Sequence, residues 1–463
     1  MPDGSSRPGK RVKSTFNTLE RENNFKNPPK DASVVPILNE FVTPHIESFN
    51  ALFDDSGLPA GDGDGKGLLR LGLEDIGKRN VYANIPSVWY EQVTVARPMV
   101  PERDRDAVER RVFPTEARER LTSYRGRMMV KICWQVNDGP VETEMRDCGL
   151  LPIMVRSVRC NLRGMSSADL VKHHEEPEEF GGYFVINGNE RLIRYLILPR
   201  RHHVISLIRP SFVNRGPSYT PYAVQIRCVR PDQTSVTNTL HYLSNGSAML
   251  RFSWRKQEYV IPIMLILKAL VSASDKEIFE GVMMQDYEDT FLSDRVELLL
   301  RSFKMYSLYT GDQCLQYLGD KFRVVVNMPE DWTNQAIGVW LINKVVLVHL
   351  QNPREKFRML LFMLRKLYAV VSKSCSVDNP DSPQHQEVLL PGTLYGMIIK
   401  ERLEEALNGF REGIAIDVRT SNPAVDFFDK RYIKKVLART NYDIGAKTGL
   451  ADGGRGGERC VDR

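Results

Sequence analysis

The sequence predicts an α+β fold divided into two or three domains. Three observations lead to this prediction. The chain has 463 residues, which is too long for one compact core. Residues 81–162 are rich in short β-forming segments, such as MMVKICWQV at residues 128–136. Amphipathic helical patterns follow in the second half of the chain, at residues 356–373 and 394–410.

The overall composition is that of a folded protein with a mild preference for anionic partners. The chain is 42% hydrophobic and 26% charged, with a net charge of +6. No apolar run reaches the ~18 residues of a membrane span, so we expect no membrane contact. Residues 1–30 are polar and are expected to be a disordered tail. Four basic residues in this tail are either a nuclear address or a commonplace basic segment: Arg7, Lys10, Arg11 and Lys13.

The seven cysteines are scattered, and no two are closer than twelve residues. A zinc site needs thiols or imidazoles at short spacing, so we expect no metal site here. Single cysteines without a signal sequence indicate a reducing compartment, where they serve as small core residues.

The stretch GGYFVINGNERLIR at residues 181–194 could be taken for a phosphate-binding loop. A P-loop needs a lysine after its last glycine, and this stretch has none. Asn187–Gly188 is instead the dipeptide that best tolerates a tight hairpin turn between two strands. The sequence therefore predicts a β-hairpin here.

Other elements follow from the same patterns. Asn245–Gly246 predicts a second hairpin, leading into a strand in which Leu250, Phe252 and Trp254 share one face. Residues 260–271 predict a buried helix, and residues 275–297 form a strongly acidic segment. Inward-facing residues define the two amphipathic helices: Phe357, Leu360, Leu361, Leu364, Leu367, Tyr368 and Val371 in the first, and Ile399, Leu403, Ala406, Leu407 and Phe410 in the second.

No motif predicts a catalytic residue. Asp426 and Asp429 are too few for two-metal phosphoryl transfer, which needs several converging carboxylates. GDGDGKG at residues 61–67 lacks the ligand pattern of a calcium-binding loop. We therefore expect neither a complete active site nor a metal site in this chain.

The strongest signal is a run of arginines. Residues 191–256 contain ten arginines and one lysine against one aspartate, a net charge of +10. Arginine suits phosphate because its planar guanidinium donates two hydrogen bonds at once. The alternative is that several of these arginines pair with the acidic segment or with another subunit. The residues predicted to bind nucleic acid are Arg194, Arg200, Arg201, Arg215 and Arg255.

Two longer stretches resemble a known family. LLPIMVRSVRCNL at residues 150–162 and EEPEEFGGYFVINGNERLIR at 175–194 resemble the amino-terminal part of the second-largest (beta-like) subunit of multisubunit RNA polymerases. Segments at 208–235, 252–259, 316–325 and 378–401 resemble the polymerase I type, of fungal kind. His385 is followed by Gln386–Glu387, where polymerase II relatives usually carry a basic residue.

The resemblance implies an architecture and a set of partners. Residues 31–204 and 386–446 would form a protrusion domain, and residues 205–385 a mixed α/β lobe inserted into it. Implied partners are the largest polymerase subunit, a TFIIF-like heterodimer and a zinc-ribbon small subunit at the lobe, DNA and the DNA–RNA hybrid. The activity would be DNA-directed RNA synthesis. It would take place in the nucleus, within the nucleolus. Magnesium would be held mainly by the largest subunit, and the zinc-binding clamp region would be absent from this chain.

The resemblance ends at Ala446. The following KTGLADGGRGGERCVDR has no apolar periodicity, so residues 447–463 are expected to be an aberrant, disordered tail. The isolated chain is expected to be inactive. Two alternatives remain open: an interaction scaffold or decoy that binds polymerase subunits without DNA, and a free-standing nucleic-acid-binding protein.

Overall fold

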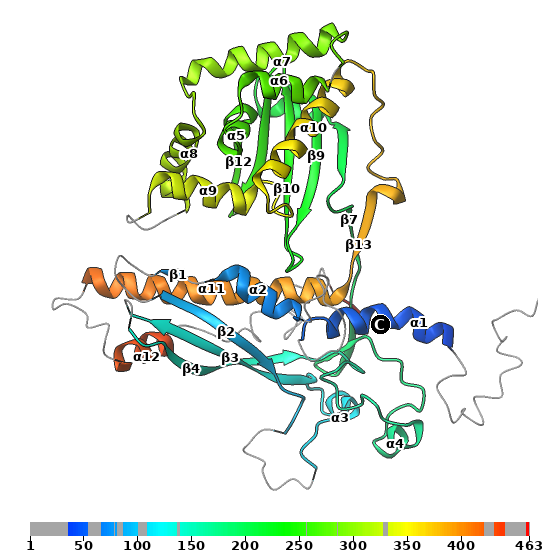
Figure 1. The fold of residues 1–463 in the computed structure, drawn as a ribbon. Coiled ribbons are helices and arrows are strands. Elements are labelled where there is room, and N and C mark those ends of the chain that lie inside the picture. Colours follow the sequence, from blue (N-terminus) through cyan, green and yellow to red (C-terminus); the bar gives the residue numbers. More distant parts are fainter. Residues whose placement is uncertain are drawn as a thin grey trace, which may run out of the picture.

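The computed structural model describes residues 36–53, 66–77, 79–80, 87–100, 109–136, 139–255, 257–284, 286–326, 332–420, 430–439 and 460–462. The predicted tail at residues 1–30, Asp426 and Asp429, and most of GDGDGKG lie outside these residues. The described chain is a mixture of helices and strands, as predicted, and it forms two units that lie one above the other in Figure 1.

The first unit, the lower one in Figure 1, is built on an antiparallel sheet with the strand order β1-β2-β3-β4. Its strands are β1 (Arg79–Asn80), β2 (Ser87–Val95), β3 (Arg125–Gln135) and β4 (Glu142–Pro152). β3 confirms the strand predicted at residues 128–136. Met128, Val130 and Ile132 alternate into the core, as expected for a strand with one covered face.

Helices cover one face of this sheet. They are α1 (Pro36–Asn50), α2 (Leu68–Ile76) and the long α11 (Pro391–Thr420), with α12 (Lys430–Arg439) at the far end of α11. Two short helices, α3 (Pro114–Glu119) and α4 (Ser167–Lys172), lie below the sheet in Figure 1. The inward stripe predicted for residues 394–410 is confirmed, because Ile399, Leu403 and Phe410 are each about 1% exposed.

The hairpin predicted at Asn187–Gly188 is confirmed. β5 (Phe184–Ile186) pairs with β6 (Asn189–Ile193). Both turn residues have positive φ, 49° at Asn187 and 79° at Gly188, which is the requirement of a type I′ turn.

Three residues of the segment expected to be a disordered tail are instead a strand. β14 (Cys460–Asp462) pairs antiparallel with β6, with Val461 opposite Leu192. The outer edge of a two-stranded hairpin offers unpaired backbone groups, so even a short segment can add to it.

The second unit is a five-stranded antiparallel sheet with helices on one face. Its strand order is β12-β11-β10-β9-β8, formed by β8 (Val204–Ile208), β9 (Tyr219–Val229), β10 (Ser235–Leu243), β11 (Ala248–Trp254) and β12 (Gln257–Pro262). The predicted hairpin at Asn245–Gly246 joins β10 to β11. A short 3-10 helix, η6 (Pro210–Arg215), joins β8 to β9.

The helices of this unit are α5 (Ile263–Leu270), α6 (Asp275–Met283), α7 (Thr290–Phe303), α8 (Gly311–Val326), α9 (Asn334–Val345) and α10 (Pro353–Val371), with η7 (Lys304–Tyr306) after α7. α10 confirms the apolar stripe predicted for residues 356–373. Six of the seven residues of that stripe are buried, and the seventh, Val371, is partly buried. The buried helix predicted at residues 260–271 starts later, at Ile263, because Val260 and Ile261 pair with β11. β-branched residues favour such pairing.

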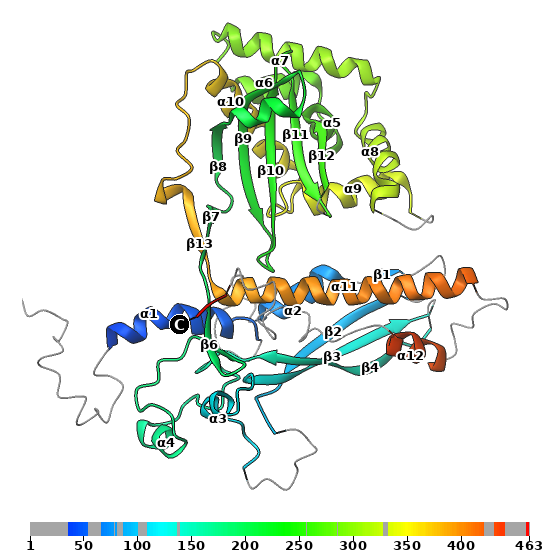
Figure 2. The same ribbon diagram turned by 180° about the vertical axis from the view of Figure 1, so that it is seen from behind.

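Two antiparallel strands join the units. β7 (Leu196–Pro199) leads upward and β13 (Gln386–Leu389), preceded by η8 (Pro383–His385), returns beside it (Figure 2). Each unit has its own hydrophobic core. The first draws on residues between Phe49 and Ile193 and again between Leu389 and Val436, and the second on residues from Val204 to Tyr368. The second unit is thus inserted between two parts of the first.

Within the ranges given above, no helix has both the length and the apolar character needed to cross a membrane.

Candidate nucleic-acid interface

Most of the predicted arginines lie at one end of the five-stranded sheet. Because its strands are antiparallel, the start of β8, the β9–β10 turn and the β11–β12 turn all meet at this end. In Figures 1 and 2 this end points down toward α11. We call it the basic end. It carries Arg200, Arg201, Arg230 and Arg255.

Arg200 and Arg201 are adjacent but have different surroundings. Arg201 is fixed: its Nε donates to Glu387 Oε2 at 3.0 Å, and a terminal nitrogen donates to Gln233 Oε1 at 2.8 Å. Arg200 uses its backbone N–H to bond His385, and its side chain is exposed. Arg200 is therefore the better placed of the two to meet a ligand.

Glu387 holds two arginines. Besides Arg201, it accepts a hydrogen bond from Arg227, whose side chain is 4% exposed. Burial alone would raise the pKa of Glu387, but the hydrogen bonds from Arg227 and Arg201 outweigh it and lower the pKa below its ordinary value.

Glu258 on β12 also holds two arginines. Arg215 donates to one carboxylate oxygen at 2.9 Å and Arg251 to the other at 2.6 Å. Burial opposes ionisation, but the two guanidinium groups keep the pKa of Glu258 below its ordinary value. Through Glu258, Arg215 of η6 lies beside the β11–β12 hairpin that carries Arg255.

Arg255 lies at the tip of that hairpin. Its side chain is exposed and its guanidinium sits 5.9 Å from the centre of the Trp254 ring, within cation–π distance. Arg194 follows β6 and is exposed; it belongs to the start of the connection between the units, so the structure does not gather it with the others. The expected alternative partner, the acidic segment 275–297, forms no ion pair with these arginines among the described residues.

A buried histidine lies under η6. His241 is 0% exposed, neither ring nitrogen has a hydrogen-bond partner, and its ring meets Phe212 edge-on at 4.8 Å. Burial, with a smaller effect of Arg251 and Arg215, lowers the pKa of His241 to about 4. It is therefore a neutral core residue at physiological pH.

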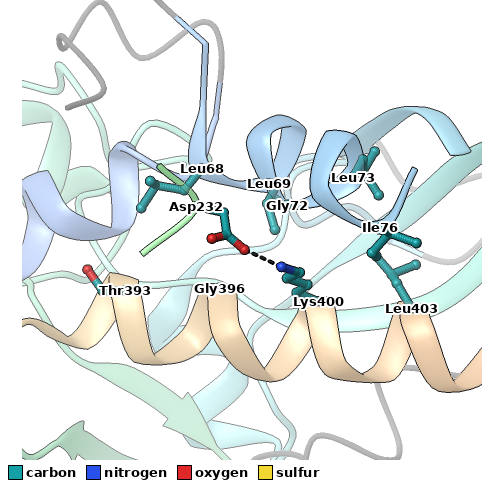
Figure 3. Close-up of a pocket in the computed structure, with 10 residues that line it drawn as sticks. All are labelled: Leu68, Leu69, Gly72, Leu73, Ile76, Asp232, Thr393, Gly396, Lys400 and Leu403. Atoms are coloured by element: carbon teal, nitrogen blue, oxygen red, sulfur yellow. Dashed lines mark hydrogen bonds and ion pairs between the residues drawn. The ribbon is translucent and has the colours of Figure 1, made fainter. Parts of the chain in front are cut away.

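The basic end is tied to the first unit by ion pairs. Asp75 on α2 accepts from Lys344 on α9 and from Lys400 on α11, at 2.7 Å each. Lys400 also donates to Asp232 in the β9–β10 turn (Figure 3). Burial would raise the pKa of Asp75, but the two lysines hold it well below its ordinary value. The cavity at this contact encloses about 10 Å³, which is room for about one water molecule. It is therefore a packing contact between the two units and not a ligand pocket.

The sequence reasoning missed one basic element. α12 carries five Lys or Arg among its 10 residues, and Arg431, Lys434 and Lys435 are exposed. Tyr432 anchors this helix by donating to Asp417 on α11 at 3.0 Å. The signal was present in KRYIKKVLAR, where basic residues alternate with an apolar stripe at helical spacing.

No group of three or more His, Cys, Asp or Glu side chains in the described ranges is arranged to hold a metal ion. The magnesium ion implied by the resemblance thus has no set of ligands among these residues, and no chemical step is assigned to them.

Comparison with known proteins identifies the family. A family model described as RNA polymerase beta subunit matches residues 40–440. The chain belongs to the RNA polymerase beta subunit family. It is 53% identical over 446 residues to the probable DNA-directed RNA polymerase I subunit RPA2 of Schizosaccharomyces pombe, which covers 94% of this chain and 37% of that protein. It is 50% identical over 462 residues to subunit RPA135 of Saccharomyces cerevisiae, covering 95% of this chain and 38% of that one.

More distant family members agree. The human DNA-directed RNA polymerase I subunit RPA2 is 43% identical over 317 residues, 68% of this chain and 28% of the human protein. These relatives confirm the predicted resemblance to the polymerase I type of the family. This chain spans about 37% of the length of the fungal relatives.

Proposed function

We propose that this chain is part of the second-largest subunit of RNA polymerase I and contributes to DNA-directed synthesis of ribosomal RNA precursors only within the assembled enzyme. The observation that carries this proposal is 50–53% identity to polymerase I subunits along 94–95% of the chain. The isolated chain would not polymerise nucleotides.

The first unit would be the protrusion and the second the inserted lobe, with boundaries near residues 204 and 385. The two separate hydrophobic cores and the paired connection of β7 and β13 support this division. The partners would be the largest subunit, and at the lobe a TFIIF-like heterodimer and a zinc-ribbon subunit. The enzyme would act in the nucleus, within the nucleolus.

Nucleic acid would meet the basic end. Glu387 and Glu258 each bind two arginines but neutralise the charge of only one. Both of these ion-pair clusters therefore keep a net positive charge. Arg200 and Arg255 would contact phosphate directly, with Arg194 further along the path. Arg201 and Arg215, which glutamates hold in place, would add to the positive potential.

The test is the salt dependence of binding to duplex DNA and to a DNA–RNA hybrid. Each phosphate contact contributes about 0.9 to the slope of log K against log salt. The double variant Arg200→Gln/Arg255→Gln should lower the slope by about 2, whereas Arg301→Gln on α7 and Arg358→Gln on α10 serve as matched controls at exposed arginines. Equal slopes for all variants would contradict DNA contact at the basic end.

A scaffold that binds subunits without DNA is the second candidate, because the second unit exposes large apolar side chains away from the basic end. Met305 is 86% exposed and Tyr309 is 72% exposed, and such residues mark protein interfaces when they cluster. If Met305→Ser abolishes assembly with polymerase subunits while the arginine variants change nothing, the scaffold function is favoured.

A further inference from the structure

The polypeptide connects the two units on one side of the molecule only. The ribbon of β7 and β13 carries the chain from the first unit into the second and back again (Figures 1 and 2). Among the described residues, the two hydrophobic cores have no member in common. Units of one chain that do not share an apolar core tend to move relative to each other. The ribbon is therefore suited to act as a hinge, and contacts away from it decide how the second unit is oriented.

A chain of ion pairs makes such a contact. Asp75 on α2 accepts from Lys344 of the second unit through one carboxylate oxygen and from Lys400 of the first unit through the other. Lys400 donates in addition to Asp232 of the second unit. The order Lys344, Asp75, Lys400, Asp232 alternates in charge and crosses from one unit to the other twice.

The second unit inserts a carboxylate into the surface of the first. Nine of the ten residues that line the small cavity at this contact belong to α2 and α11, and the tenth is Asp232 (Figure 3). Asp232 is 8% exposed, and the side chain of Lys400 is 12% exposed. Because such burial weakens the screening by water, each of these charges depends strongly on its partner.

The second unit holds its two contributing groups in place. Thr234 donates its backbone N–H and its hydroxyl to Oδ1 of Asp232, at 3.2 and 2.8 Å, which leaves Oδ2 to accept from Lys400. Arg230 in the same turn donates to the backbone carbonyl of Lys344 at 2.7 Å. The aspartate of the β9–β10 turn and the lysine of α9 are therefore fixed relative to each other and meet the first unit together.

We propose that these four residues form a latch, which holds the second unit in the observed orientation and whose opening lets that unit turn about the β7–β13 ribbon. The closed latch keeps the basic end facing α11, whatever ligand the basic end binds. A contact that only stabilises a unit would behave differently. Its loss would unfold part of that unit, whereas opening of the latch changes the distance between the units and leaves both hydrophobic cores intact.

The experiment measures the distance between the units in the full chain by double electron–electron resonance. Nitroxide labels are attached through ketone-bearing amino acids at Val324 on α8 and Ile416 on α11, because the chain contains seven cysteines. Both positions are exposed, by 86% and 58%, and α8 and the last turns of α11 lie away from the ribbon in Figures 1 and 2. The unaltered chain should give one narrow distance distribution.

Opening the latch should add longer distances to this distribution. In Lys400→Met and in Asp75→Asn we expect the population of longer distances to rise roughly tenfold or more, since each variant removes charge-assisted hydrogen bonds between the units. Lys400→Arg keeps the charge and should retain most of the narrow distribution. Amide hydrogen exchange in the cores of both units should stay slow in every variant.

Lys268→Met is the matched control. The side chain of Lys268 is 11% exposed and pairs with Asp275 at 2.8 Å, but both residues belong to the second unit. This variant should keep the narrow distribution. The proposal is overturned if the unaltered chain already shows a broad distribution, if Lys400→Met and Asp75→Asn leave it narrow, or if Lys268→Met broadens it equally.

Discussion

The ion-pair clusters of the molecule differ in their ratio of arginines to carboxylates. In the first unit a single arginine, Arg118, lies within 4 Å of three carboxylates, those of Glu175, Glu179 and Glu190. In the second unit and the connection that leads into it the ratio is reversed, because Glu387 on β13 and Glu258 on β12 each hold two arginines. The same kind of ion pair thus leaves excess negative charge in the Arg118 network and excess positive charge in the Glu387 and Glu258 clusters.

This difference distinguishes charges that stabilise the fold from charges that can act on a partner. Glu175 has a fully buried side chain and Glu179 is 4% exposed, so the Arg118 network lies inside the fold and stabilises it. Tyr183 completes the network by donating to Glu179 at 2.9 Å. The Glu387 and Glu258 clusters reach the surface, since Arg201 is 40% and Glu258 is 52% exposed, and their unbalanced charge can act on a partner there.

The largest effect is expected from Arg118→Met. Removing one partner of a buried ion pair leaves uncompensated charge, which costs about 3–5 kcal/mol, and here two buried carboxylates lose their cation. Urea unfolding monitored by fluorescence should show this loss. Arg120→Met is the control, because its side chain is 71% exposed and 3.9 Å from Glu116, a pair worth about 0.5 kcal/mol or less. Equal stability of the two variants would mean that the Arg118 network does not hold the first unit together.

Glu387→Gln comes next, with an expected loss of about 2 kcal/mol, because Arg227 is buried and would lose its charged acceptor. The pKa of Glu387 is lowered in the folded state. Its contribution is therefore fully present above its ordinary pKa of about 4.3 and declines as the pH falls below that value. Unfolding curves between pH 7 and about 3 should show this acid-dependent part in the unaltered chain and its absence in the variant. An unchanged acid profile would contradict the assignment of two arginines to one glutamate.

His241→Phe should remove a pH dependence of the second unit. The folded-state pKa of about 4 lies below the ordinary value of 6.5, so the unfolded chain binds more protons between these values and stability rises with pH across this window. The linkage amounts to about 2 kcal/mol between pH 8 and pH 5. Phenylalanine can keep the aromatic contact with Phe212 without unpaired ring nitrogens. Thermal unfolding of both proteins at pH 5 and pH 8 measures the difference, and an equal pH dependence in the variant would be the contrary result.

The smallest effect on stability is expected from Glu258→Gln, about 1 kcal/mol or less, because its side chain is 52% exposed. Its effect on binding should be opposite in sign to that of the arginine variants. Removing this charge leaves Arg215 and Arg251 uncompensated, so affinity for duplex DNA should increase a few-fold at low salt and the gain should vanish at high salt. Unchanged or weaker DNA binding would place the nucleic-acid path elsewhere than at the basic end.

Local structure was predictable where one short segment carries its own signal. Asn187–Gly188 specified a hairpin because both turn residues must adopt positive φ. The inward-facing apolar residues of α10 and α11 could be predicted because side chains three and four positions apart share a helix face. The strand at Val260–Ile261 was taken for helix, since a short apolar run has no distinguishing period and only pairing with β11 decides it.

For the predicted site, the sequence revealed the concentration of arginine but not the role of each arginine. Ten arginines in one window indicated an anionic partner, but their roles depended on acids far away in the chain: Glu387 lies 186 residues after Arg201 and 160 after Arg227. The same Gln386–Glu387 step that indicated the polymerase I type of the family thus contains the glutamate that holds these arginines. α12 was not predicted, although KRYIKKVLAR carries five Lys or Arg among 10 residues.

By itself, the sequence determined the family, the main helices, the two hairpins and the concentration of positive charge, because each is encoded in contiguous residues. Tertiary structure alone decided which arginines are exposed and which share a glutamate. These properties depend on contacts between distant segments, and the energy of a charge depends on its burial and its nearest opposite charge, neither of which a linear sequence contains.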